Sequence, residues 1–169
     1  MKVSQRGFNL IELMLGLTIA GVLLSVGMPA LRDMTLRQRM VTSSQDLRMD
    51  MMFARQEAIT RGSTATVCPT TDNVSCDGGT DWALGRIVFA DVNGNGAFDA
   101  GDTVVRQSPA LQAAMTATST RSFATFDALG GHPAGGFMVS ICRADMTQMN
   151  VRVRRAGQSS ADKTTTVCP

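Results

Sequence analysis

Residues 8–31 read FNLIELMLGLTIAGVLLSVGMPAL, and Glu12 is the only charged residue among them. As a helix, a run of this length spans the hydrocarbon core of a bilayer, which is about 30 Å thick. The preceding residues, MKVSQRG, contain Lys2 and Arg6. Because basic flanks stay on the cytoplasmic side of a membrane, the sequence predicts a transmembrane helix over 8–31 with a cytoplasmic N-terminus.

The basic leader, residues 1–7, is not typical of a secretory signal. Such a signal has a short apolar region followed by a small-residue cleavage site, whereas here the small residue Gly7 precedes a long apolar stretch. Cleavage after Gly7 would remove the leader and create a new amino terminus at Phe8. That amine would pair with Glu12, whose carboxylate otherwise costs about 2–3 kcal/mol or more in a membrane. The alternative is that Glu12 is solvated at the level of the lipid headgroups.

The prepilin cleavage motif of type IV pilins and type II secretion pseudopilins is similar to one string here, Gly7-Phe8-Asn9-Leu10-Ile11-Glu12-Leu13. The resemblance implies that a prepilin peptidase cuts after Gly7 and N-methylates Phe8. It also implies that Glu12 pairs with the Phe8 amine of a neighbouring subunit and so sets the register of a filament. The protein would then be bacterial, single-pass in the inner membrane, with its head in the periplasm or, within a pilus filament, outside the cell.

Residues 32–62 continue the helical pattern but are amphipathic. Apolar residues recur at steps of three to four along one stripe, Met40, Leu47, Met51, Ala54 and Ala58. Neither Pro nor Gly occurs in this segment before Gly62, which suits a C-terminal stop. We interpret the stripe as a surface that packs against a sheet; the alternative is that its methionines form a pliable binding surface.

After Gly62 the sequence changes to short runs rich in β-branched residues, with turn residues between them. Strands are predicted over residues 64–68, 83–91, 103–107, 122–126, 137–142, 150–154 and 164–167. Short connections between sequential strands imply an antiparallel sheet or a pair of sheets. The predicted fold class is therefore α+β, with a long N-terminal helix packed on a β-rich globular head, residues 63–169. The lone Trp82 is expected in its core.

The chain has four cysteines, Cys68, Cys76, Cys142 and Cys168, which favour an oxidising compartment. Three disulfide connectivities are possible, and the sequence does not choose among them. We favour the two local pairings, Cys68–Cys76 around a short loop and Cys142–Cys168 between a strand and the last residues. A metal site of four thiolates is the rival, but no CxxC spacing supports it.

Five stretches of the head follow a family pattern: Val67-Cys68-Pro69, Trp82–Asp91, Asn93–Gly96 with Gly101-Asp102, Phe126-Asp127 with Gly130, and Gly136–Cys142. They resemble the H-type minor pseudopilins, a group that includes the FimT/FimU-like minor pilins of type IV pili. The resemblance implies a pilin-like fold and a non-enzymatic role in filament assembly or priming and in protein secretion. It also implies other major and minor pilins or pseudopilins as partners.

Residues 91–102 read DVNGNGAFDAGD and fit a twelve-residue calcium loop. Oxygen-bearing side chains fall at positions one, three, five, nine and twelve, namely Asp91, Asn93, Asn95, Asp99 and Asp102. The last is Asp rather than Glu, and the flanks read as strands rather than as the helices of an EF-hand. The alternative is a turn-rich hairpin loop whose acids are solvated and bind no ion. No other cofactor is expected.

Charge is segregated within the head. Residues 72–102 contain six acids and one base, a net charge of −5, whereas residues 143–163 contain five bases and two acids, a net charge of +3. A basic cluster of Arg152, Arg154, Arg155 and Lys163 would suit the phosphates of DNA. The alternative is a solvated or subunit-facing surface that meets the acidic loop of a neighbour.

Some FimT-like minor pilins are DNA receptors in natural transformation and use a Gly-Arg-x-Arg element near the C-terminus. The matching stretch here is Val151-Arg152-Val153-Arg154-Arg155-Ala156-Gly157, which lacks the leading Gly. The resemblance therefore supplies DNA uptake as the alternative function. No aromatic residue lies nearby for base stacking.

The composition argues against an enzyme, because the 169 residues include one His and no Tyr. No catalytic constellation is recognisable. The formal net charge of +2 is carried by Lys2 and Arg6, since residues 8–169 contain 14 bases and 14 acids. We therefore expect a structural filament subunit of a pilus or a secretion system, with a DNA-binding minor pilin as the alternative.

Overall fold

The structure is a computed structural model that describes residues 9–112 and 114–169. The chain divides into two compact units, Met1–Gln38 and Arg39–Pro169. We call the second the head unit, and each unit is described by itself. Gly7 and Phe8, the predicted sites of cleavage and N-methylation, lie outside the described residues.

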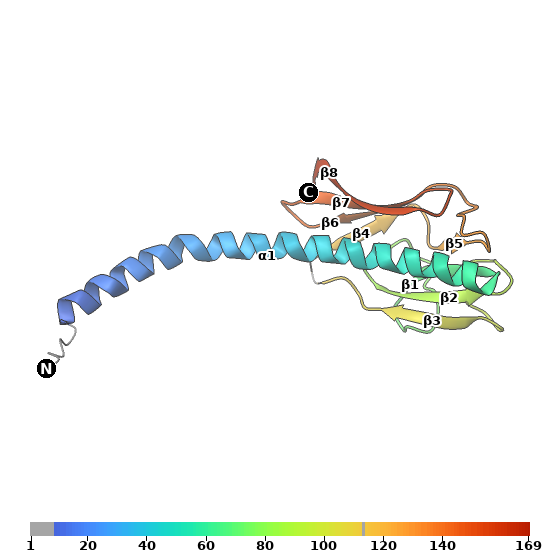
Figure 1. The fold of residues 1–169 in the computed structure, drawn as a ribbon, viewed down its shortest axis with the longest axis horizontal. Coiled ribbons are helices and arrows are strands. Elements are labelled where there is room, and N and C mark those ends of the chain that lie inside the picture. Colours follow the sequence, from blue (N-terminus) through green and yellow to red (C-terminus); the bar gives the residue numbers. More distant parts are fainter. Residues whose placement is uncertain (1–8, 113) are drawn as a thin grey trace, which may run out of the picture. The chain divides into compact units, whose positions relative to one another are not determined.

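One helix, α1 (Leu10–Arg61), accounts for both predicted helical segments (Figure 1). It begins after Asn9, whose carbonyl oxygen accepts hydrogen bonds from the backbone N–H groups of Glu12 (3.0 Å) and Leu13 (3.2 Å). It ends at Arg61, and the next residue, Gly62, has a φ of +65°, which a glycine adopts without a Cβ penalty. The sequence therefore predicted the C-terminal end of the helix to within one residue.

The first unit presents its apolar side chains to solvent. Leu10, Leu17 and Leu23 are 75%, 65% and 68% exposed. Within the described residues, no helix combines the length and the apolar character needed to cross a membrane.

In the described part of the head unit, eight strands form two four-stranded antiparallel sheets (Figure 1). The first sheet has the order β3-β2-β1-β5, and the second has the order β4-β6-β7-β8. Their bounds are β1 Thr64–Thr70, β2 Gly85–Asp91, β3 Thr103–Ser108, β4 Thr116–Ser119, β5 Ala124–Phe126, β6 Phe137–Cys142, β7 Thr147–Val153 and β8 Ser159–Val167. This arrangement confirms the predicted α+β, pilin-like fold with an antiparallel head.

Seven of the eight strands overlap a predicted strand, and β4 was missed. Its sequence, TATS, offers only small residues, and just Ala117 is buried in its interior. The strand exists because β6 supplies a partner, with Ala117 opposite Ile141. Pairing across the chain, rather than local propensity, therefore defines this strand.

The main core lies between the second half of α1 and both sheets. The predicted stripe is buried, with Leu47, Met51, Ala54 and Ala58 fully buried and Met40 3% exposed. They join side chains from both sheets in one cluster, including Val67, Phe126, Val139, Ile141 and Val151. Trp82 is in the same cluster, edge-on to Phe137 at 5.1 Å, which confirms the prediction that it packs in the core.

A second, smaller core covers the other face of the first sheet. Cys68, Ile87 and Phe89 form it, with Phe98 and Cys76 packed against them. Phe98 meets Phe89 edge-on at 5.4 Å. The acidic loops before β2 and before β3 therefore cover this face of the sheet. Cys76 anchors the first loop to it, and Phe98 anchors the second.

Candidate functional site

Glu12 lies in the first turn of α1 and is exposed, among apolar side chains that are also exposed. A carboxylate at a helix N-terminus interacts favourably with the helix dipole. Its predicted partner, the Phe8 amine of a neighbouring subunit, lies outside the described residues. The pairing therefore stays a prediction.

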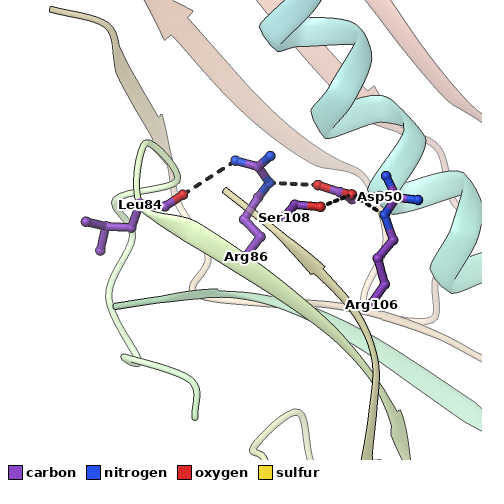
Figure 2. A network of polar contacts seen from close by, with 5 residues as sticks. All are labelled: Asp50, Leu84, Arg86, Arg106 and Ser108. Atoms are coloured by element: carbon purple, nitrogen blue, oxygen red, sulfur yellow. Dashed lines mark hydrogen bonds and ion pairs between the residues drawn. The ribbon is translucent and has the colours of Figure 1, made fainter. Parts of the chain in front are cut away.

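A buried polar network joins α1 to the first sheet (Figure 2). The Asp50 carboxylate accepts hydrogen bonds from Arg86 Nε (2.8 Å), Arg106 Nε (2.9 Å) and Ser108 Oγ (2.6 Å). Asp50 and Arg86 are each 1% exposed at the side chain, whereas Arg106 is 38% exposed. Arg106 also lies over the ring of Phe53, 5.4 Å from its centroid.

This network fixes the position of the helix on β2 and β3. A buried carboxylate is tolerable only where donors replace its hydration, and here three donors do so. Sequence reasoning missed Asp50. The available signal was its position on the buried stripe, three residues after Leu47 and four before Ala54.

The structure contains both favoured disulfides, Cys68–Cys76 and Cys142–Cys168. The first ties the loop after β1 to the smaller core. The second holds the last residues beside β6, where the Cys168 backbone N–H also donates to the Met146 carbonyl oxygen (2.8 Å). Within the described part of the chain, no cysteine is free for a thiolate metal site.

In the predicted calcium loop, Asp91 is fully buried and faces inward. One carboxylate oxygen accepts a hydrogen bond from the Gly94 N–H (2.7 Å). The other accepts from the Gly96 N–H (2.9 Å) and from Thr66 Oγ1 (2.8 Å). Asp91 therefore stabilises the loop conformation by accepting hydrogen bonds from the loop backbone and from β1.

The remaining loop oxygens are also occupied by loop donors. Asp102 accepts from the backbone N–H groups of Val92 (2.9 Å) and Asp99 (3.0 Å). The Asp99 carboxylate accepts from the side-chain amides of Asn93 and Asn95. Among the described residues, no three His, Cys, Asp or Glu side chains converge as metal ligands would. The calcium site therefore stays a prediction.

The four basic residues predicted for DNA are exposed but do not share one face. Arg152 lies in β7 opposite Ser160, on the face away from the core, while Val151 and Val153 point inward. Lys163 lies opposite the buried Met149 and so belongs to the other face of the sheet. Arg154 and Arg155 follow in the turn after β7.

His132 lies in the loop between β5 and β6 and is buried between Phe126 and Phe137, with ring centroids at 5.8 Å and 6.0 Å. Its Nδ1 lies 2.6 Å from the Thr125 carbonyl oxygen, whereas its Nε2 has no hydrogen-bond partner within the described chain. Burial lowers the pKa of His132 below its ordinary value. The ring is therefore neutral, with Nδ1 as the donor.

One family profile, described as "Type II transport protein GspH", matches residues 43–157, which is more than half of the chain. Among solved structures, the chain is similar to the type IV minor pilin FimU of Pseudomonas aeruginosa. One crystal form aligns with a TM-score of 0.61 and 19% identity, covering 78% of this chain and 97% of FimU. A second gives 0.57 and 18%, covering 74% and 97%.

The minor pseudopilin EpsH from the type 2 secretion system of Vibrio cholerae aligns with a TM-score of 0.49 and 14% identity, over 72% of this chain and 94% of EpsH. No curated protein sequence matches the chain. At the identities found, the likeness to FimU is a likeness of fold.

Proposed function

The chain belongs to the GspH family of type II transport proteins, and from this membership we propose that it is a minor pilin or pseudopilin that takes part in filament assembly or priming. Its role would be structural rather than enzymatic. Other pilins or pseudopilins would be its partners, and a prepilin peptidase would process it after Gly7.

The observation that carries the proposal is the exposed apolar surface of the first unit. Large side chains remain more than half exposed along α1, from Leu10 (75%) to Met34 (70%). Burying a side chain of this size contributes about 1.5–3 kcal/mol, so this surface favours a second apolar environment. We propose that lipid supplies it before assembly, with residues 8–31 anchored in the inner membrane, and that neighbouring helices supply it in the filament.

The site within this surface is Glu12, the only charged residue between Leu10 and Leu31. In an apolar assembly its carboxylate requires a cation, and the processed Phe8 amine of a neighbour would provide one. The head would lie in the periplasm, an oxidising compartment that suits both disulfides. In a pilus, the same head would be outside the cell.

Filament recovery after shearing tests this proposal. The host would carry the wild-type chain, Glu12→Gln, or the control Asp46→Asn, which changes an exposed carboxylate of α1 in the head unit. We expect the wild-type and control chains in the sheared filament fraction and the Glu12→Gln chain at least tenfold depleted, with all three processed and retained in membranes. Equal recovery of Glu12→Gln would contradict the role of this carboxylate, and absence of the wild-type chain would contradict the filament role.

DNA binding is a second candidate function, supported by the exposure of Arg152, Arg154 and Arg155 at one end of β7. Two of them belong to a turn, where they can adapt to a phosphate backbone. A triple Ala variant would be compared with the wild type for binding to duplex DNA at low salt. A loss of at least tenfold would support a receptor role, and unchanged affinity would exclude it for this cluster.

A further inference from the structure

A groove of about 270 Å³ lies on the head unit between α1 and the residues around the start of β8. Arg48, Met52, Arg55 and Ile59 line it from the helix, and Ser159 lines it from β8. The helix residues are spaced at steps of four, three and four, which places them on one helix face. We call it the Arg48/Arg55 groove.

The two arginines are held in place without neutralisation. Arg48 Nε donates to the Ser159 carbonyl oxygen (3.1 Å), and Arg55 Nε donates to the Gly130 carbonyl oxygen (2.9 Å). Neither forms an ion pair with a carboxylate in the described part of the chain, whereas Arg61, Arg86 and Arg106 do. These backbone bonds orient both guanidinium groups and leave their charge available to a ligand.

The rest of the groove lining is both polar and apolar, with Gln56, Gly157, Gln158 and Ser159 beside Met52 and Ile59. Ser159 Oγ is buried and has no hydrogen-bond partner among the described residues. Met52 lies between the arginines on the helix face and is 44% exposed, while Ile59 is 43% exposed. The groove therefore offers two cations, a free hydroxyl and an apolar floor.

We propose that the Arg48/Arg55 groove binds an acidic peptide segment of a neighbouring filament subunit. This inference rests on the proposed function and adds the chemistry of the partner. Arg48 and Arg55 are seven residues apart, or about 10 Å along the helix axis. Two carboxylates that flank an apolar residue on one face of an extended segment span about 13 Å, which the flexible arginine side chains can match. The apolar residue then lies on Met52.

A peptide suits this groove better than a nucleic acid does. Nucleic-acid grooves present rows of cations to successive phosphates and aromatic rings to the bases, and neither lines this groove. Each guanidinium group can form a bidentate contact with one carboxylate. Acidic segments also occur in this chain, since residues 72–102 carry a net charge of −5.

Calorimetry with the full chain in detergent micelles tests the binding step. The probe is the peptide acetyl-Glu-Ser-Leu-Ser-Glu-amide, and its control is the same peptide with Gln in place of both Glu. Met52→Glu adds a repelling carboxylate at the groove, while Met49→Glu makes the same change at an exposed position outside it. We expect the acidic peptide to bind at least tenfold more weakly to Met52→Glu and less than twofold more weakly to Met49→Glu.

Equal binding of the two peptides, equal loss in the two variants, or no binding to the wild type would overturn the proposal. Binding of a DNA duplex in place of the peptide, weakened by Met52→Glu, would also overturn it. In the host, we expect Met52→Glu to be depleted from sheared filaments relative to Met49→Glu. Absence of the wild-type chain from filaments refutes the proposed function, whereas equal recovery of wild type and Met52→Glu refutes only the groove.

Discussion

The first half of α1 is richer in apolar residues than the second, and the two halves differ in what covers those residues. In the first unit, Leu10, Leu17 and Leu23 are more than half exposed, whereas in the head unit Leu47 and Met51 are fully buried. In the head unit, the apolar residues of α1 pack against two sheets. The described residues of the first unit include no sheet that covers the helix, and under the proposed function lipid or neighbouring helices cover its apolar residues.

Two of the carboxylates of α1, Asp50 and Glu12, show the same difference. Asp50 is buried and receives three donors from the head, whereas Glu12 is exposed. Substitutions in the head unit should therefore change its free energy of unfolding. Substitutions in the first unit should change assembly instead. Substitutions in the head unit test how far its stability depends on contacts within that unit.

The largest effect is expected from Asp50→Ala. It would leave Arg86, 1% exposed at the side chain, without its carboxylate. Breaking one side of a buried ion pair costs about 3–5 kcal/mol. Denaturant unfolding of the full chain, followed by Trp82 fluorescence, measures this loss. The control Asp46→Ala removes an exposed carboxylate one turn earlier and should change stability by less than about 0.5 kcal/mol. A loss below 1 kcal/mol for Asp50→Ala would show that Arg86 finds another partner.

Asp50 also illustrates what sequence alone could not supply. The helical stripe predicted which face of α1 is buried, because periodicity follows from local geometry. The partners of Asp50 come from β2 and β3, at least 36 residues away along the chain. Burial of a charge depends on such distant partners, so the position of Asp50 on the stripe was a signal of burial but not a sufficient one.

The disulfides are expected to have the next largest effects. Replacing both cysteines of Cys142–Cys168 with Ser should lower the free energy of unfolding by about 3.5 kcal/mol, and replacing those of Cys68–Cys76 by about 2.5 kcal/mol. The two values differ because Cys142–Cys168 closes a longer loop, with a sequence separation of 26 residues against 8 for Cys68–Cys76. Denaturant unfolding of the two double variants gives both values. The reverse order would show that packing of Cys68 in the smaller core outweighs loop closure.

Local sequence patterns explain which features of the head could be predicted. Strands with alternating or β-branched runs, such as β1 and β6, were found from sequence, while β4 was not. The position of His132 in a loop follows from the glycines and the proline that surround it, but the sequence did not predict its burial. Its burial depends on Phe126 and Phe137, which the fold brings to it from both sides.

His132 should make the head unit less stable in mild acid. Its pKa is lowered in the folded state, so below about pH 6.5 the unfolded state binds the proton more readily. Stability should therefore fall as the pH decreases from 7.5 to 5.5. Asp72, whose pKa is lowered by the Ser75 and Val74 backbone N–H groups, titrates below its ordinary value of 3.8 and does not contribute in this range.

The measurement for His132 is denaturant unfolding at several pH values, with His132→Phe as the comparison. Phe fills a similar volume between the two rings and cannot be protonated. Its stability should change little between pH 7.5 and 5.5. An equal pH dependence in the two proteins would assign the effect to another group.

The smallest effect on stability is expected from added calcium. This experiment tests whether the acidic loop is stable, like the core beneath it, without a ligand. The oxygens of Asp91, Asp99 and Asp102 already accept hydrogen bonds from the loop, and Phe98 anchors it to Phe89. We therefore expect 1 mM Ca²⁺ to raise the melting temperature of the full chain by less than about 1 °C. A site with a Kd of about 10 μM would instead add about 2.7 kcal/mol, or roughly 5–10 °C for a domain of this size. A rise of that order, absent with Mg²⁺ and lost in Asp99→Asn, would mean that the loop binds calcium and that the ion stabilises it.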